Sequence, residues 1–454
     1  MPESSTIDPP PVGAMTEGVT DHISRKAVKA LSAQEPEWLR DRRLHAWSVY
    51  ERTPMPTRRL EEWRYTDLSR MLKLDRMSLL PWSERRFSTG DAPTALSSAL
   101  SSDQEASGHV VDLDGSVAHV DLDAELSSKG VILTSLREAV GEHRRLLEEF
   151  LATQAVPSES GKFQALNAAL WTDGILLHVP SGVRIELPVR VSRWISEPGR
   201  ALFSRTLIIA EEGSSVSFVD EVQSPNFEEQ TLVSSAVEVF ARAGAQVQFV
   251  SLQRMGRGTF HLSQQCTLAD NDSTLDTMNV SLGATVARVD LNVELRGTGA
   301  NSNMLGLYFG EDDQHFDHNT KQDHRAPHSK SDLLYKGALD GKARAVFRGI
   351  IKVHRGAQQT DAYQTNRNLL LSEDARAESL PNLEIEADDV RCSHGASVGQ
   401  LDQEPLFYLM SRGLSRPQAE RLVVMGFLGE VLSRLPLRGV VERVSAIIEE
   451  RLRA

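Results

Sequence analysis

The stretch Leu207-Ile-Ile-Ala-Glu-Glu-Gly-Ser-Ser-Val-Ser-Phe-Val219 decides the fold. Two short apolar-rich runs lie on either side of a turn centred on Gly213. The pattern returns at Val237-Glu-Val-Phe-Ala-Arg-Ala-Gly-Ala-Gln-Val-Gln-Phe-Val250, with Gly244 at its turn. Period-two alternation indicates half-buried strands, and glycine supplies the backbone conformation of a tight turn. The chain therefore contains strand–turn–strand units that repeat.

Units of this kind fill residues 171–401. The turn residues Gly213, Gly244, Asn271 and Gly299 recur at intervals of 27 to 31 residues. No helix-length periodic stretch interrupts them, which argues against a βαβ fold, because helices separate the parallel strands there. A large sandwich, a propeller and a β-solenoid remain. The blade motif of a propeller is missing, and a solenoid tolerates unequal spacing because each coil buries its face on its neighbours.

The region before the strands has a different texture. Residues 21–170 contain helical patches such as Pro36 to Tyr50, so we predict an N-terminal helical domain. Within it, residues 88–107 are rich in Ser, Ala and Asp, which predicts a flexible loop. Residues 1–20 contain much Ser and Pro and lack a signal-peptide pattern, so we predict a disordered leader.

Residues 402–454 are predicted to form a C-terminal helical domain. Ser415 and Gln418 have the spacing of a capping box, and apolar residues then follow at helical spacing until Pro436. A second amphipathic helix comes after this proline. Two such helices either pack on the β-rich domain or present a groove to a partner, and both alternatives produce the same periodicity.

Composition limits the possible functions. The chain is 40% hydrophobic and 25% charged, a composition typical of globular proteins, and its formal net charge is −13. Its length of 454 residues indicates more than one folding unit. The acidic balance and the lack of a basic stripe disfavour nucleic acid. Apolar runs are far shorter than the roughly 20 residues that cross a bilayer, so no membrane contact is expected. The two cysteines, Cys266 and Cys392, suit the cytoplasm and are too few for a four-cysteine cluster site.

Two segments contain candidate metal ligands. Residues 315–328 are rich in His and Asp, but strand alternation divides these side chains between two faces, which predicts a hydrogen-bonded polar ladder. Cys392 and His394 are two residues apart and would project from one face of a strand. Thiolate and imidazole both bind iron, although a buried cysteine beside a structural histidine is the commoner arrangement. The sequence contains no P-loop, Gly-x-Ser-x-Gly or His-Glu-x-x-His motif.

Several long motifs resemble the SufB/SufD family of iron–sulfur cluster assembly proteins. They lie within residues 316–339, 347–353 and 387–413, and a weaker match is Glu61-Glu-Trp-Arg-Tyr-Thr-Asp-Leu68. This resemblance implies a right-handed parallel β-helix between N-terminal and C-terminal helical domains. It also implies a complex of SufB, SufD and the ATPase SufC, which receives sulfur indirectly from a cysteine desulfurase and its activator.

The family's SufD branch is the better match. The residues before Pro381-Asn-Leu-Glu384 contain no cysteine, and Ser393-His-Gly395 stands where SufB-type chains have Glu-His-Glu. The resemblance implies that His394 faces a SufB cysteine as a cluster ligand, with Cys392 as its neighbour. It also implies that SufC docks on the C-terminal helices, for which the candidate contact residues are Leu422, Val423, Phe427, Val431 and Val444.

We therefore expect a non-catalytic, cytoplasmic scaffold subunit. It should hold no cofactor tightly by itself and carry an iron–sulfur cluster transiently in the complex, and a homodimer is considered for the isolated chain. One alternative is a SufB-like scaffold that assembles clusters alone, which the missing cysteine before Pro381 disfavours. The other is a β-helix carbohydrate-active enzyme, a class that is usually secreted, whereas this sequence has no signal-peptide pattern.

Overall fold

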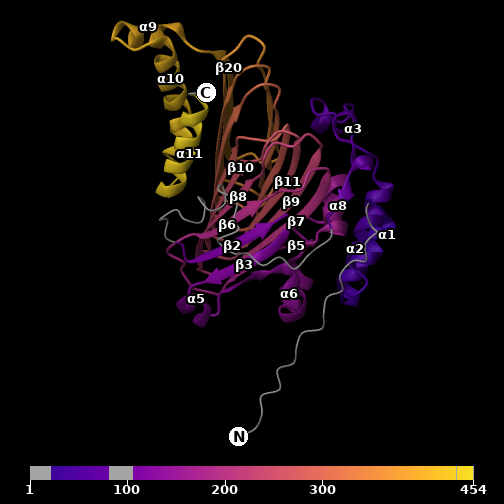
Figure 1. Ribbon diagram of the computed structural model, residues 1–454. Helices are drawn as coiled ribbons and strands as arrows, with labels where there is room; N and C mark the ends of the chain where they lie inside the picture. The colour runs from indigo at the N-terminus through magenta and orange to yellow at the C-terminus, as the bar shows by residue number, and fades with distance from the viewer. Residues whose placement is uncertain (1–21, 81–105, 436, 453–454) are drawn as a thin grey trace, which may run out of the picture.

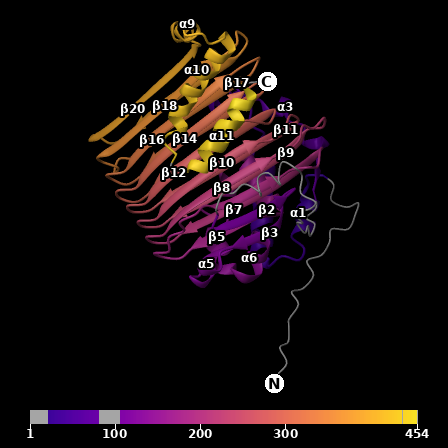
Figure 2. The ribbon, with the colours of Figure 1, turned by 60° about the vertical axis from the view of Figure 1, so that its left-hand side comes forward.

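The fold is a parallel β-helix of about eight turns with helices on two sides (Figures 1 and 2). The computed structural model describes residues 22–80, 106–435 and 437–452. Two ten-stranded sheets face one another, and the chain alternates between them. The predicted leader and most of the predicted flexible loop lie outside the described residues.

The first sheet contains the odd-numbered strands of the coils. Its coil strands are β5 (Asp173–Val179), β7 (Arg200–Ala210), β9 (Thr231–Ala241), β11 (Thr259–Ala269), β13 (Val286–Leu295), β15 (His315–His324), β17 (Arg344–Val353) and β19 (Arg376–Ile385). The second sheet contains β6 (Val189–Trp194), β8 (Ser215–Gln223), β10 (Gln246–Arg254), β12 (Thr274–Ser281), β14 (Asn301–Gly310), β16 (Lys330–Leu339), β18 (Thr360–Leu370) and β20 (Val390–Gln400). Neighbouring coil strands are parallel throughout.

Stacked turns connect the two sheets. Gly213 and Gly244 both have φ of +66°, a conformation that glycine adopts without steric cost. The Gly213 N–H donates to the Ala243 carbonyl of the next coil at 2.9 Å. The turn glycines that predicted repeated units therefore mark the corners of successive coils.

Strand register gives the length of a coil. Phe260 pairs with Val286, 26 residues later, and Arg344 pairs with Arg376, 32 residues later. Coils of different length can still stack strand on strand, because the loops between the strands absorb the extra residues. The predicted β-solenoid is confirmed, and the sandwich and propeller alternatives are wrong.

An N-terminal layer covers the outer face of the first sheet. It includes α1 (Arg25–Leu31), α2 (Glu37–Arg52) and α8 (Lys162–Leu170), whose buried apolar residues form one cluster with outward side chains of β7, β9 and β11. Its remaining elements are η1 (Glu61–Trp63), α3 (Leu68–Met71), η2 (Leu74–Arg76), β1 (Ser78–Leu79), α6 (Leu136–Glu142), α7 (Arg144–Phe150) and η3 (Ser158–Ser160). Helix α5 (Ala124–Ser128) lies instead at the N-terminal end of the β-helix, where its Leu126 packs in the inner core.

Strands also occur in the region for which we expected helices. β2 (Gly108–Leu113) and β3 (Ser116–Leu122) extend the second sheet, and β4 (Ile132–Ser135) extends the first. The β2–β3 and β4–β5 pairs are antiparallel and close the N-terminal end of the β-helix. These strands have four to seven residues, which is too short for a clear period-two signal.

Two C-terminal helices lie along the outer face of the second sheet (Figure 2). They are α10 (Arg416–Leu432) and α11 (Arg438–Arg451), and their buried side chains form one apolar cluster with strands β8 to β16. The Ser415 N–H donates to Gln418 Oε1 at 2.9 Å, in the predicted capping box. A shorter helix, α9 (Gln403–Ser411), projects beyond the sheet (Figure 1).

Candidate functional site at the open end of the β-helix

Strands β19 and β20 end the two sheets, and no strand in the described residues pairs with their outer edges. No residue of either strand is buried, whereas β5 near the other end is buried at six of its seven positions. Ile385 and Val398 are 40% and 44% exposed. We call this surface, formed by β19 and β20, the open end. Unpaired backbone groups and exposed apolar side chains on an edge strand favour pairing with another chain.

His394 lies in the middle of β20 with its side chain on the inner side of the last coil. Strand register places it beside the buried Gln364 of β18, and it places Cys392 beside the buried Ala362. The His394 side chain is exposed, and it makes no hydrogen bond to another residue in the described part of the chain. Its imidazole is therefore available to a ligand that approaches the open end.

Cys392 lies on the same side of β20 as His394, as predicted from their spacing. Its side chain is half-buried and packs near Leu383 and Val390 in a small apolar cluster. Burial raises the pKa of the Cys392 thiol, and the Asp361 carboxylate raises it further. A protonated thiol is a poor ligand, so a metal would have to displace its proton.

Cys266 lies far from this pair, on the outer face of β11 beneath the N-terminal layer. Burial raises the pKa of its thiol well above the usual range. The two cysteines therefore contribute to different surfaces. In the ranges that the structure describes, no group of three or more His, Cys, Asp or Glu side chains could hold a metal ion.

The histidine-rich segment 315–328 forms hydrogen bonds on both faces of β15. On the outer face, Thr66 donates to Asp317 at 2.5 Å and contacts His315 Nε2 at 2.8 Å. On the inner face, His318 stacks on Tyr308 with ring centroids 4.8 Å apart, and burial lowers the pKa of His318 to about 4. This agrees with the hydrogen-bonded ladder that alternation predicted.

The five predicted docking residues differ in accessibility. Val431 and Val444 are fully buried against the second sheet, Val423 and Phe427 are half-buried, and Leu422 is 51% exposed. Most of the apolar stripe on α10 and α11 thus packs on the β-helix. A partner could reach Leu422 directly, but it could not reach the two buried valines without moving the helices.

Helix α9 carries an apolar surface that was not among the docking residues predicted from helical periodicity. Phe407 is 75% exposed, Tyr408 is 56% exposed and Met410 is 42% exposed. Helix α9 packs on α10, which bears the exposed Leu422. We call these four side chains the α9 patch. Exposed aromatic residues in such a group mark interaction surfaces. The run of apolar residues in Leu406-Phe-Tyr-Leu-Met410 was the available signal.

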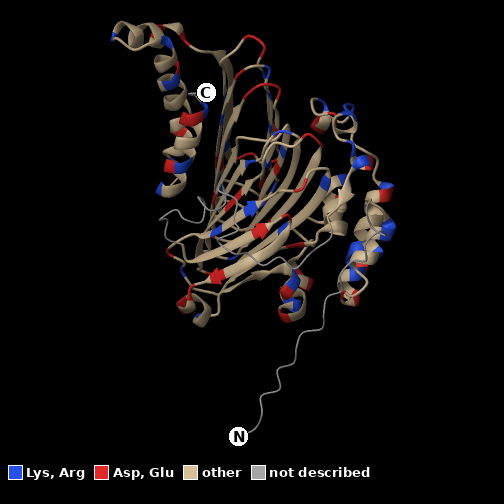
Figure 3. Cartoon of the chain, viewed as in Figure 1, with Lys and Arg blue, Asp and Glu red and all other residues tan. Residues whose placement is uncertain are grey.

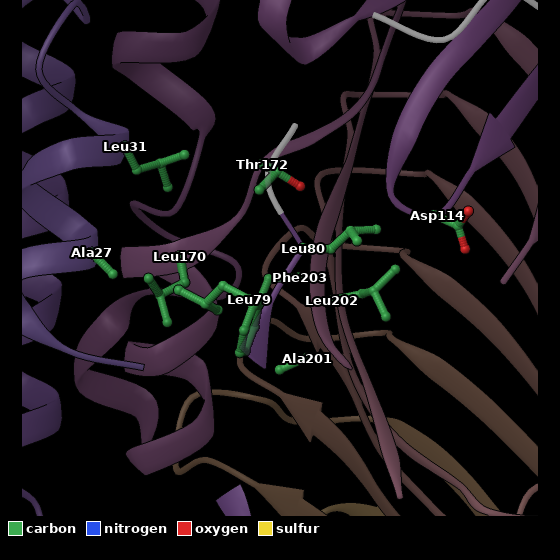
Figure 4. Close-up of a pocket in the computed structure, with 10 residues that line it drawn as sticks. All are labelled: Ala27, Leu31, Leu79, Leu80, Asp114, Leu170, Thr172, Ala201, Leu202 and Phe203. Carbon is green, nitrogen blue, oxygen red and sulfur yellow. The ribbon is translucent and has the colours of Figure 1, made fainter. Parts of the chain in front are cut away.

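A small gap between α1, α8 and the first sheet is lined mostly by apolar side chains (Figure 4). Its volume is about 10 Å³, the size of one water molecule. Its carboxylate, Asp114, accepts hydrogen bonds from the Ser196 N–H at 2.6 Å and the Ser196 hydroxyl at 2.8 Å. This gap is a packing feature and no binding site.

Comparison with known proteins agrees with this architecture. Residues 193–427 match the SufBD core domain of the SUF system for FeS cluster assembly, and residues 21–191 match the SufBD protein N-terminal region. The iron–sulfur cluster assembly protein SufD of Bacillus subtilis is 31% identical over 97% of this chain and 100% of its own length. An iron–sulfur cluster assembly SufBD family protein of Staphylococcus haemolyticus is 29% identical over 94% of this chain and 91% of its own.

The chain therefore belongs to the SufB/SufD family of the SUF system for iron–sulfur cluster assembly. The full-length similarity to a SufD protein supports the assignment of this chain to the SufD branch of the family. No helix in the described ranges is long and apolar enough to span a membrane.

Proposed function

We propose that the chain is a SufD-type scaffold subunit that works in the cytoplasm and catalyses no reaction by itself. It joins a SufB-type subunit through the open end, and a nascent iron–sulfur cluster is assembled at this junction. The cluster is cargo and leaves the complex after assembly. The observation that carries the proposal is the exposed imidazole of His394 in the middle of an edge strand, β20, whose outer edge pairs with no strand of the described chain.

The chemistry of His394 fits this role. Neutral imidazole can replace thiolate as an iron ligand in clusters. The two cysteines of this chain lie on different surfaces, so a partner must supply further ligands. Because His394 faces the inner side of the last coil, a β-structure added to the open end would bring partner side chains next to it. Cys392 is the neighbouring candidate ligand, provided that binding displaces its proton.

The α9 patch is the proposed docking surface for the ATPase SufC. Of the five docking residues predicted from the sequence, Leu422 belongs to this patch. The buried residues Val431 and Val444 would support docking indirectly, by holding α10 and α11 on the second sheet. Deleting both helices would expose the apolar outer face of this sheet, so point substitutions on α9 give a cleaner test. The cysteine desulfurase and its activator would act on this complex through the SufB-type subunit.

Co-purification with the SufB-type partner tests the proposal. In a double variant, Ile385→Asp with Val398→Asp, two carboxylates must be desolvated for the open end to pair, so we expect an affinity loss of about tenfold or more. The matched control is Leu187→Asp, since Leu187 is 38% exposed outside the open end and should tolerate a charge. Unchanged association of the double variant would show that the junction lies elsewhere.

The same double variant tests the homodimer considered for the isolated chain. If two copies associate through their open ends, light scattering should show a dimer for the wild type and a monomer for Ile385→Asp with Val398→Asp. A dimer that persists in this variant would assign self-association to another surface and would leave the test with the SufB-type partner unaffected.

A further inference from the structure

A positively charged surface lies where the N-terminal layer meets the first sheet, and it borders the open end at Leu380 of β19. A cavity of about 470 Å³ there is lined by Arg58, Arg59, Arg64 and Arg348, and Glu61 is the one carboxylate among the described residues that line it. Figure 3 shows Lys and Arg gathered on the turns beside α3 in this layer. In a chain of net charge −13, such a local excess of cations creates a field that attracts anions.

The segment that carries these arginines is fixed in place. Thr66, which follows Tyr65, binds Asp317 and His315 of β15. Arg288 of β13 donates to the Glu62 carbonyl at 2.9 Å, and its guanidinium carbon lies 3.7 Å from the centroid of the Trp63 ring. Contacts on both sides of the segment thus hold it against the first sheet. A ligand would meet a prearranged site, which reduces the entropy lost on binding.

The arginines have spare hydrogen-bonding capacity. Arg348 Nη2 lies 3.4 Å from Glu61 Oε1, and only 15% of the Arg348 side chain is exposed. Its buried Nε has no hydrogen-bond partner in the part of the chain that the structure describes. Arg59 and Arg64 form no ion pair with any residue that the structure describes. Each guanidinium presents up to five N–H donors in a planar fork, which matches carboxylate and phosphate oxygens.

A second cavity of about 460 Å³ adjoins the first and shares Arg348 with it. Side-chain amides from three strands line it, and the buried carbonyl oxygens of Gln264, Asn292 and Asn319 have no hydrogen-bond partner among the described residues. Gln264 is only 4% exposed. A buried acceptor without a partner is energetically unfavourable, so these three oxygens favour a ligand that carries N–H or O–H donors.

We propose that the two cavities form one binding site for a small polar molecule that carries a multiply charged oxyanion, either phosphate or carboxylate. The oxyanion binds the arginines of the first cavity, and the remainder of the molecule donates hydrogen bonds to the amide oxygens of the second. The combined space suits a small molecule, because ligand pockets are commonly about 300–1,000 Å³. The site borders β19 at Leu380, but none of the side chains proposed for the junction or the α9 patch lines it.

Titration calorimetry with pyrophosphate and with citrate tests the site in the full chain. We expect saturable binding that weakens as salt increases. The double variant Arg59→Ala with Arg64→Ala should bind about tenfold more weakly or worse, whereas Glu61→Gln should bind more tightly, because the competing carboxylate is gone. Arg52→Ala is the matched control, since Arg52 is an exposed arginine of the same layer that does not line either cavity.

The two probes distinguish the two chemistries. Binding of pyrophosphate alone assigns a phosphate ligand, binding of citrate alone assigns a carboxylate ligand, and binding of both assigns recognition by charge. The proposal is overturned if neither probe saturates, or if Arg52→Ala weakens binding as much as the double variant. Thermal melting of each variant separates lost binding from lost folding, and the open-end variants should bind the probes normally.

Discussion

The two ends of the β-helix are built differently. The N-terminal end is closed by the antiparallel pairs β2–β3 and β4–β5 and by helices α5 and α6 (Figure 1). The C-terminal end stops at β19 and β20, which nothing in the described chain covers. Because both ends continue the same two sheets, their difference is informative. A closed end contributes to stability, whereas an open end leaves backbone and side chains available to a partner.

Buried charge distinguishes the closed end most clearly. Arg193 lies inside it, with Nη1 2.6 Å from Asp112 and Nε 2.8 Å from Asp220. Arg193→Met would leave two buried carboxylates without their cation, and we expect unfolding free energy to fall by about 3–5 kcal/mol. Denaturant unfolding measures this loss. Arg391→Met is the matched control on β20, where an exposed arginine should change stability by less than about 0.5 kcal/mol.

Equal losses for Arg193→Met and Arg391→Met would remove the energetic contrast between the ends. Loss confined to Arg193 would support it. A gain in stability from Arg193→Met would mean that the carboxylates of Asp112 and Asp220 become protonated at little cost in the variant. Burial already raises the pKa of Asp112 in the wild type.

The closed end should also respond to pH. Asp173 of β5 accepts N–H groups from Val117 at 3.1 Å and from Arg137 at 3.3 Å, so it ties β3 and α6 to the first sheet. Burial outweighs these donors and raises the pKa of Asp173 to about 7. Since the unfolded carboxyl titrates near pH 4, the folded state binds more protons between about pH 4 and 7. The Asp173 contribution to stability is therefore full below pH 4 and is lost as pH rises to 7.

Comparison with Asp173→Asn isolates this contribution. Buried histidines such as His318 and His324 have pKa values lowered to about 4, so they act in the opposite sense over the same range. We expect the free energy of unfolding of the wild type, relative to the variant, to decline by up to about 1.4 kcal/mol per pH unit between pH 5 and 7. A difference between the two proteins that stays constant with pH would exclude a raised pKa for Asp173.

Local patterns predicted the coils well but not their ends. Gly213 and Gly244 were visible in the sequence because glycine adopts the positive φ of a corner without steric cost, although Asp272 adopts it at another corner. Strands β2 to β4 were missed because they are short and because their pairing joins distant residues, as in the antiparallel pair of Leu133 with Leu177. The alternation of Cys392 and His394 likewise predicted a shared face, but not that their strand is the last one of its sheet.

The C-terminal helices show the same limit. Periodicity identified an apolar stripe, but a stripe that packs on a sheet and a stripe that binds a partner have the same spacing. The structure separates them, because Val431 and Val444 are buried while Phe407 and Leu422 are exposed. Burial is a property of the whole fold, so the accessible part of a predicted interface could not be chosen from sequence alone.

A substitution on the α9 patch should act on binding and not on stability. Phe407→Ser removes the most exposed aromatic side chain of the patch, so we expect the affinity for SufC to fall by about tenfold or more. Unfolding free energy should change by less than about 0.5 kcal/mol. Gln403→Ser, at another exposed position of α9, is the control. Native affinity of Phe407→Ser in surface plasmon resonance would place SufC on another surface.

The smallest effect on stability is expected at His394, where the open end should carry its function. The imidazole is exposed and makes no hydrogen bond within the described chain, so His394→Ala loses little packing and leaves no buried group unpaired. We expect an unchanged melting temperature and normal association with the SufB-type partner, together with a clear loss of cluster formation in cells, measured through the activity of a cluster-dependent reporter enzyme.

Ser393→Ala, whose side chain points to the opposite face of β20, should behave like the wild type. His394→Cys supplies another iron ligand and should restore part of the activity, which a purely structural histidine would not predict. Normal cluster production by His394→Ala would assign cluster ligation to other residues of the junction.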